Sequence, residues 1–308
     1  MGSFFAFRSS GREVLKAVDG INFSIKKGET FGLVGESGSG KSTTARLITR
    51  LIEATRGQIE FDGQEILGLS RAAFQSLRRR IQMVFQDPYS SLNPRMKIRD
   101  VIGNPLRLHH IVEPNQTQER IVELLEMVGL QADHQYRYPH EFSGGQRQRI
   151  SVARAMALEP EIIIADEAVS ALDVSVRAQI LNLFVRLKNT RQLTYLFIAH
   201  DLSVVEHFCE RVAVMYGGKI VEIAKVDDLF NKPLHPYTEA LISSIPEPDP
   251  SQDFQPRVLE GEVVNLINRP PGCVFFGRCP EAKEICGEVE PELLEKQGDR
   301  QVACHLRD

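Results

Sequence analysis

The chain has 308 residues, of which 42% are hydrophobic, and it carries a formal net charge of −4. This length suffices for one large domain with an appended segment. The small negative charge excludes a strong attractive field for nucleic acid, so we expect no nucleic-acid partner. No apolar run approaches the roughly 20 residues that a membrane-spanning helix needs, so we expect any membrane attachment to come through partners.

A glycine-rich loop separates an expected strand from an expected helix near the start of the chain. Residues 35–42 read Gly-Glu-Ser-Gly-Ser-Gly-Lys-Ser, between the apolar run 30–34 and a helical pattern at 43–48. This is a P-loop, whose glycines let the backbone approach phosphates and whose N–H groups bind them at a helix N-terminus. The expected ATP contacts are Gly35, Ser37, Gly38, Gly40, Lys41, Ser42 and Thr43, and the Ser42 hydroxyl is also expected to bind Mg²⁺.

Hydrophobic patterning divides the chain up to residue 230 into three regions. Residues 1–95 predict mostly strands and turns, residues 96–157 predict helices, and residues 158–230 alternate between strand and helix. Alternation of this kind argues for an α/β core. The individual elements that we expect are strands at 21–25 and 58–62, a helix at 117–128, a strand at 194–199, a helix at 202–208 and a strand at 211–216.

A second apolar run, at residues 162–165, is followed by Asp166 and Glu167. Its isoleucines suit a strand buried on both faces of a parallel sheet, and ligands bind at the C-terminal ends of such strands. Alone, this pattern is more often a core strand followed by a solvated turn. Together with the P-loop it indicates that Asp166 binds Mg²⁺ and that Glu167 polarises the attacking water.

Further motifs complete a series that resembles the nucleotide-binding subunit of an ABC transporter. They match its Q-loop at Gln86, its signature at residues 143–149 (Ser-Gly-Gly-Gln-Arg-Gln-Arg), its D-loop at residues 170–173 and its switch histidine at His200. The resemblance implies an α/β P-loop NTPase cassette, with a RecA-like core, an antiparallel β subdomain and a helical signature subdomain at about 96–157. We expect the ATPase domain to span 1–232 and a C-terminal extension with a four-cysteine motif to span 233–308.

The resemblance also implies a composite ATP site between two head-to-tail ATPase subunits, which ATP closes and hydrolysis releases. Glu167, His200 and Gln86 would be the catalytic residues, with Gln86 also contacting Mg²⁺. The signature would cap the ATP bound to the partner subunit, since another helix N-terminus is exposed there. The ATP contacts implied in this way are Ser143, Gly144, Gly145, Gln146 and Asp173.

Three segments narrow the resemblance to the oligopeptide and dipeptide importers, with the F-type ATPase as the nearer match. They are residues 85–95, 169–175 and 233–238 (Pro-Leu-His-Pro-Tyr-Thr). This group implies a heterodimer with a second ABC ATPase, two integral membrane permeases and an extracytoplasmic solute-binding protein. The chain would power import of peptides or related small solutes from the cytoplasmic face of the inner membrane. The alternative is an ATPase subunit of a soluble enzyme complex, such as phosphonate breakdown machinery.

Four of the five cysteines lie in the tail, spaced C-x5-C-x6-C-x17-C, while Cys209 stands apart as an expected packing residue. A segment of about 35 residues rarely holds itself together without disulfides or a metal, and cytosolic chains do not keep disulfides. Some importers of this group carry a 4Fe–4S cluster on four tail cysteines, and ligation by four cysteines suits such a cluster. Structural zinc and unliganded thiols are the alternatives. The expected ligands are Cys273, Cys279, Cys286 and Cys304.

Two departures from the family pattern concern Ala168 and the N-terminal residues. Ala168 stands where the family has proline, but the expected Mg²⁺ and base residues are intact, so we expect activity. Family members begin with a strand that ends in an aromatic residue stacked on adenine. We expect that strand to be absent here and Phe5 to be the stacking residue, with Phe4 and Phe7 as alternatives.

Overall fold

The computed structural model describes residues 14–245, 259–261, 264–267, 269–296 and 298–307. Its main sheet is formed by Thr30–Val34 (β1), Ile81–Val84 (β4), Ile162–Asp166 (β5), Thr194–Ala199 (β6), Arg211–Tyr216 (β7), Lys219–Lys225 (β8), Leu294–Lys296 (β9) and Arg300–Val302 (β10). The strand order is β4-β5-β6-β1-β7-β8-β10-β9. The first five strands in this order run parallel, and the last three join through antiparallel pairs.

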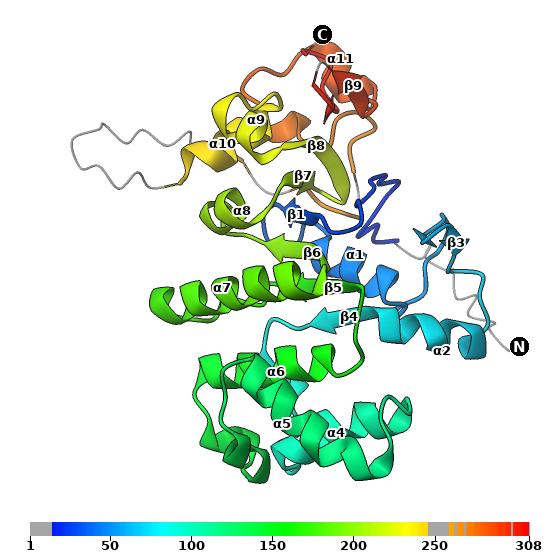
Figure 1. The fold of residues 1–308 in the computed structure, drawn as a ribbon. Coiled ribbons are helices and arrows are strands. Elements are labelled where there is room, and N and C mark those ends of the chain that lie inside the picture. The colour runs from blue at the N-terminus through cyan, green and yellow to red at the C-terminus, as the bar shows by residue number, and fades with distance from the viewer. Residues whose placement is uncertain (1–13, 246–258, 262–263, 268, 297, 308) are drawn as a thin grey trace, which may run out of the picture.

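Helices pack on this sheet and also form a separate group at one end of the molecule. They are Lys41–Ile48 (α1), Arg71–Arg80 (α2), Pro88–Ser91 (α3), Ile98–Leu108 (α4), Thr117–Met127 (α5), Gly144–Met156 (α6), Val174–Arg191 (α7), Leu202–Phe208 (α8), Val226–Asn231 (α9), Pro236–Ser243 (α10) and Glu284–Glu288 (α11). Helices α4, α5 and α6 gather away from β8 (Figure 1). No helix in the described part of the chain is long and apolar enough to cross a membrane.

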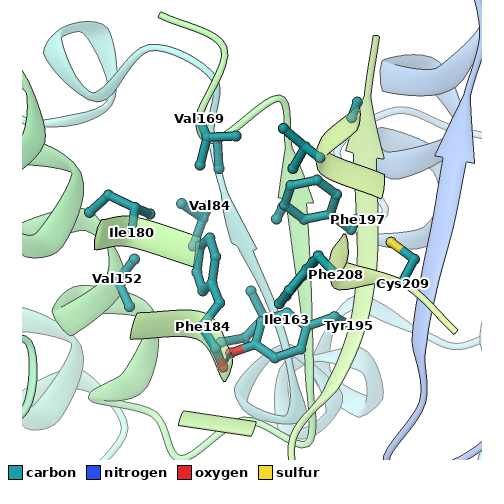
Figure 2. Packing of buried hydrophobic residues seen from close by; sticks show 14 of the residues in the cluster. Val84, Val152, Ile163, Val169, Ile180, Phe184, Tyr195, Phe197, Phe208 and Cys209 are labelled. Atoms are coloured by element: carbon teal, nitrogen blue, oxygen red, sulfur yellow. Dashed lines mark hydrogen bonds between the residues drawn. The ribbon is translucent and has the colours of Figure 1, made fainter. Parts of the chain in front are cut away.

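The sheet separates two hydrophobic cores, because neighbouring residues of a strand point to opposite faces. In β5, Ile163 belongs to the core shared with α6, α7 and α8, whereas Ile162 and Ile164 belong to the core shared with α1 and α2. Figure 2 shows Ile163 in the first core near Tyr195 and Phe208. Burial on both faces explains why these strands appear in the sequence as continuous apolar runs.

Strand and helix predictions for residues 194–216 are confirmed without any shift, as β6, α8 and β7. The prediction of a strand at residues 21–25 is wrong. Its alternation is real, since Phe23 stacks on Phe31 with ring centroids 5.4 Å apart, but no strand among the described residues pairs with this segment. The expected strand at 58–62 is reduced to Glu60–Phe61 (β2), which pairs with Gln64–Glu65 (β3).

The described part of residues 233–308, the expected C-terminal extension, shares the main sheet with the residues before it, because β10 pairs with β8. Glu222 of β8 is fully buried, and its carboxylate accepts hydrogen bonds from the backbone N–H groups of Leu234 and His235. Arg300 of β10 donates to the same carboxylate over 3.2 Å. A buried carboxylate is stable only when it is paired and hydrogen-bonded, so Glu222 joins three segments of the chain.

Candidate ATP site

The P-loop adopts a conformation that only glycine allows at two of its positions. Gly35 has a φ of 149° and Gly40 a φ of 106°, a region that residues with side chains rarely adopt. A Cβ atom at Gly35 would lie 2.0 Å from the carbonyl oxygen of Met215, and one at Gly40 would lie 2.3 Å from that of Ala17. The loop therefore approaches β7, and the segment before β1, too closely for any side chain.

Lys41 begins helix α1 with its ammonium group folded back into the loop. Its Nζ donates to the carbonyl oxygens of Gly35, at 2.7 Å, and Glu36, at 2.8 Å. Burial lowers the pKa of Lys41, and nearby carboxylates, first that of Glu167, oppose the shift. The lysine is thus a buried cation beside the space that a phosphate would enter. The other expected contacts lie around it, with Ser37 and Gly38 exposed and Ser42 and Thr43 half-buried.

The expected Mg²⁺ ligands Ser42 and Asp166 lie side by side. The Ser42 hydroxyl donates to Asp166 Oδ1 over 2.8 Å. Burial raises the pKa of Asp166, and the hydrogen bond from Ser42 opposes that shift. A hydroxyl and a carboxylate are the oxygen donors that Mg²⁺ prefers, and a bound cation would favour the ionised carboxylate. This donor pair therefore fits Mg²⁺.

Three strand ends bring the expected catalytic residues together. Gln86 follows β4, Glu167 follows β5 and His200 follows β6, and these strands are neighbours in the sheet. Gln86 Nε2 donates to Glu167 Oε2 over 2.7 Å, and His200 Nδ1 lies 3.3 Å from the same oxygen. The structure therefore places the amide of Gln86, also expected to contact Mg²⁺, against the carboxylate of Glu167, the expected catalytic base.

The signature residues stand at the N-terminus of α6, away from the P-loop of the same chain. Ser143 caps the helix by accepting from the N–H of Gln146. Ser143 and Gly144 are exposed, while Gly145 lies so close to Val176 of α7 that a Cβ atom would be 2.2 Å from its Cγ1. Within the described residues, no hydrogen bond or ion pair joins these residues to the P-loop. Figure 1 shows α6 with α4 and α5, whereas α1 lies beside β1.

Asp173 of the D-loop is exposed next to the signature. Its carboxylate caps α7 by accepting from the N–H of Val176 over 3.0 Å. The side chain of Leu172 lies 3.7 Å from the position of a Cβ atom at Gly144. The signature and the D-loop therefore form one surface, separate from the P-loop surface.

Comparison with known proteins identifies the family to which this chain belongs. The model described as ABC transporter matches residues 18–170, and the model described as Oligopeptide/dipeptide transporter, C-terminal region, matches residues 221–286. The oligopeptide transport ATP-binding protein AppF of Bacillus subtilis (strain 168) is 54% identical over 295 residues, which are 95% of this chain and 90% of that protein. This chain belongs to the ABC transporter ATP-binding proteins.

Solved ABC cassettes have the same fold. The dimeric cassette MJ0796 bound to ADP and Pi matches with a TM-score of 0.64 and 31% identity, over 71% of this chain and 94% of that one. CbiO1 from Clostridium perfringens, part of the ABC transporter complex cbiONQ, matches with a TM-score of 0.64 and 27% identity, over 70% and 84% of the two chains. The expected P-loop cassette is confirmed, and this ABC protein is an ATPase.

Sequence patterns did not reveal that the C-terminal segment of this ABC ATPase contacts its P-loop. Glu36 of the P-loop forms an ion pair with Arg278, 242 residues away, and its N–H donates to the hydroxyl of Tyr237. The segment 233–238 stood out only through its resemblance to peptide importers. The predicted adenine contact at Phe5, with its alternatives Phe4 and Phe7, lies outside the described residues.

The four tail cysteines lie near one another, but not in a metal-holding arrangement. Burial, together with a smaller effect of the other three thiols, raises the pKa of Cys273 to about 11. Burial also raises the pKa of Cys279 and Cys304. Within the described residues, no three His, Cys, Asp or Glu side chains are placed to hold a metal ion. The donor set fits a soft metal chemically, whereas its geometry in this structure does not. Cys209 is buried in the core, as expected.

Proposed function

We propose that this ABC ATPase powers the import of di- and oligopeptides. The observation that carries this proposal is the match of residues 221–286 to the C-terminal region of oligopeptide and dipeptide transporters. The name of AppF, which aligns over 95% of this chain, supports it. Both favour import over the alternative of a soluble enzyme complex. The transported solute itself would be selected by partner proteins.

The hydrolytic mechanism follows from the three groups at the strand ends. A water molecule attacks the γ-phosphorus of ATP, and the bond from that phosphorus to the bridging oxygen of ADP breaks. Glu167 accepts the proton of the water, while Gln86 and His200 hold its carboxylate in place. Mg²⁺, held by Ser42 and Asp166, would neutralise phosphate charge. Lys41 turns from the loop carbonyls toward the phosphates.

ATP binding would also join two ATPase subunits. Within the described residues, no hydrogen bond or ion pair joins the signature surface to the P-loop of the same chain. The N-terminus of α6 and Asp173 are exposed there, so we infer that this surface meets the ATP of a second subunit. MJ0796, with 31% identity, is described as dimeric with ADP and Pi. Two such ATP molecules would hold the pair closed until hydrolysis removes the bridging charge.

The proposed partners are a second ABC ATPase, two membrane permeases and a solute-binding protein that acts through the permeases. The chain would lie peripherally on the cytoplasmic face of the cell membrane. Affinity purification of the tagged protein from detergent-solubilised cells tests this assembly. We expect two multi-span membrane proteins and a different ABC ATPase to co-purify. Recovery of a soluble enzyme complex without membrane proteins would overturn the importer proposal.

We further propose that the four tail cysteines bind a 4Fe–4S cluster. Their spacing and the mutual effect of their thiols on the pKa of Cys273 support this, and cluster binding would require the thiols to lose their protons and their side chains to rotate toward one another. Anaerobically purified protein is expected to contain about four iron and four acid-labile sulfide per chain. Cys279→Ser should lose most of the iron, whereas Cys209→Ser, in the core, should keep it. Zinc without iron contradicts the cluster.

A further inference from the structure

Glu36, inside the P-loop, is held from three directions. Its carbonyl oxygen accepts from Lys41 Nζ at 2.8 Å. Its backbone N–H donates to the hydroxyl of Tyr237 at 2.9 Å. Its carboxylate is paired with both terminal nitrogens of Arg278, at 2.8 and 3.2 Å. The phosphate-binding lysine and two residues of the C-terminal extension therefore meet at one residue of the loop.

Arg278 is fixed in its position by the turn that carries it. The turn runs from Cys273 to Cys279, and its backbone is closed by a hydrogen bond from the N–H of Arg278 to the carbonyl of Phe275. The ring of Phe275 is fully buried, with its centroid 5.2 Å from that of Tyr216 and 5.4 Å from that of Tyr237. An aromatic cluster of this kind packs rigidly, so it anchors the turn against β7 and α10.

The charges of this pair depend on each other. The Arg278 side chain is only 9% exposed and that of Glu36 is 28% exposed. Arg278 Nε is buried without a hydrogen-bond partner. Among the described residues, Glu36 is the carboxylate that forms an ion pair with the Arg278 guanidinium. Without Arg278, the Glu36 carboxylate would lose its ion-pair partner in a loop that must receive a triphosphate. Because the carboxylate and the triphosphate are both negative, their repulsion would weaken ATP binding.

We propose that Arg278 is a positioning residue for ATP binding, which neutralises Glu36 and fixes the P-loop from the C-terminal extension. The proposal rests on the assignment of the chain as an ABC ATPase. Arg278 belongs to the turn between Cys273 and Cys279 and contacts none of Gln86, Glu167 and His200 within the described residues. Its removal should therefore change the affinity for ATP more than the rate of the chemical step.

The test compares variants of the full-length protein by equilibrium binding of a fluorescent ATP analogue and by steady-state ATPase kinetics. Arg278→Ala should weaken binding about tenfold, raising KM for ATP with kcat changed less than about twofold. Arg278→Lys keeps the charge but loses the two parallel hydrogen bonds. It should therefore recover about half of the binding free energy that Arg278→Ala loses. Arg278→Ala combined with Glu36→Gln should bind within about threefold of the wild type, because the uncompensated charge is gone.

Arg307→Ala is the matched control. Arg307 belongs to the same extension and pairs with Glu281 at 2.9 Å, and within the described residues no hydrogen bond or ion pair joins it to the P-loop. Its removal should leave the affinity for ATP unchanged. Wild-type affinity in Arg278→Ala overturns the proposal, and so does an equal loss in Arg307→Ala. If Arg278→Ala does not fold, Arg278→Lys and Glu36→Gln provide the same comparison. Failure of the wild type to bind ATP would instead contradict the ATPase assignment.

Discussion

Replacing Glu167 by glutamine is expected to preserve ATP binding and to lower the rate of hydrolysis at least about 100-fold. Loss of a positioned general base typically costs two to four orders of magnitude. In the wild type, Gln86 Nε2 donates to the Glu167 carboxylate over 2.7 Å. The glutamine oxygen of the variant can still accept this hydrogen bond, so we expect the substitution to disturb the surrounding structure little. Binding of ATP depends on Lys41 and the loop amides, which the substitution leaves in place. Phosphate release and equilibrium nucleotide binding measure the two effects separately.

Glu161→Gln is the control for this experiment. Glu161 directly precedes the same strand, β5, but at its opposite end, where it pairs with Arg80 Nη2 at 3.0 Å. Its loss should leave hydrolysis within about twofold of the wild type, since exposed ion pairs contribute little. Hydrolysis at the wild-type rate in Glu167→Gln would remove Glu167 from the catalytic role, and equal loss in both variants would indicate a general effect on β5.

Gly35→Ala is expected to cause the second large effect, a loss of ATP binding together with a lowered free energy of unfolding. The added Cβ would lie 2.0 Å from the carbonyl oxygen of Met215, and the φ of 149° is itself strained for alanine. Neither β7 nor the loop can move without breaking other contacts, because Lys41 bonds to the carbonyl of Gly35. We expect a loss of about 3 kcal/mol or more, measured by urea unfolding.

Gly38→Ala separates the steric clash from the backbone strain. Gly38 has a φ of 80°, but a Cβ atom there would have no neighbour within 4 Å. Only the cost of a left-handed backbone should remain, about 1–2 kcal/mol. If the two substitutions lowered the free energy of unfolding equally, the close approach of the loop to β7 would not be the reason for glycine at position 35.

The residues expected to be catalytic could be named from the sequence because their motifs resemble those of ABC ATPases. Each of these residues follows an apolar run, and parallel strands present their C-terminal ends at one edge of a sheet. The structure brings Gln86, Glu167 and His200 together at that edge. The strands and helix between residues 194 and 216 were likewise given by their patterns alone.

Contacts between distant segments could not be predicted in this way. The pairing of Glu36 with Arg278 joins residues 242 positions apart, and no periodicity in either segment indicates the other. The segment at 21–25 shows the reverse error. Its alternation correctly marks Phe23 as inward-facing, but a strand also requires a pairing partner, which a single segment cannot specify.

ATP-dependent peptide uptake tests the central claim most directly. Cells that lack the chain would receive the wild type or Glu167→Gln, and uptake of a radiolabelled oligopeptide would be measured. Restoration by the wild type and not by Glu167→Gln is the result that the account predicts. Uptake that is equal with the wild type, with the variant and with neither would contradict the claim that this ABC ATPase powers peptide import.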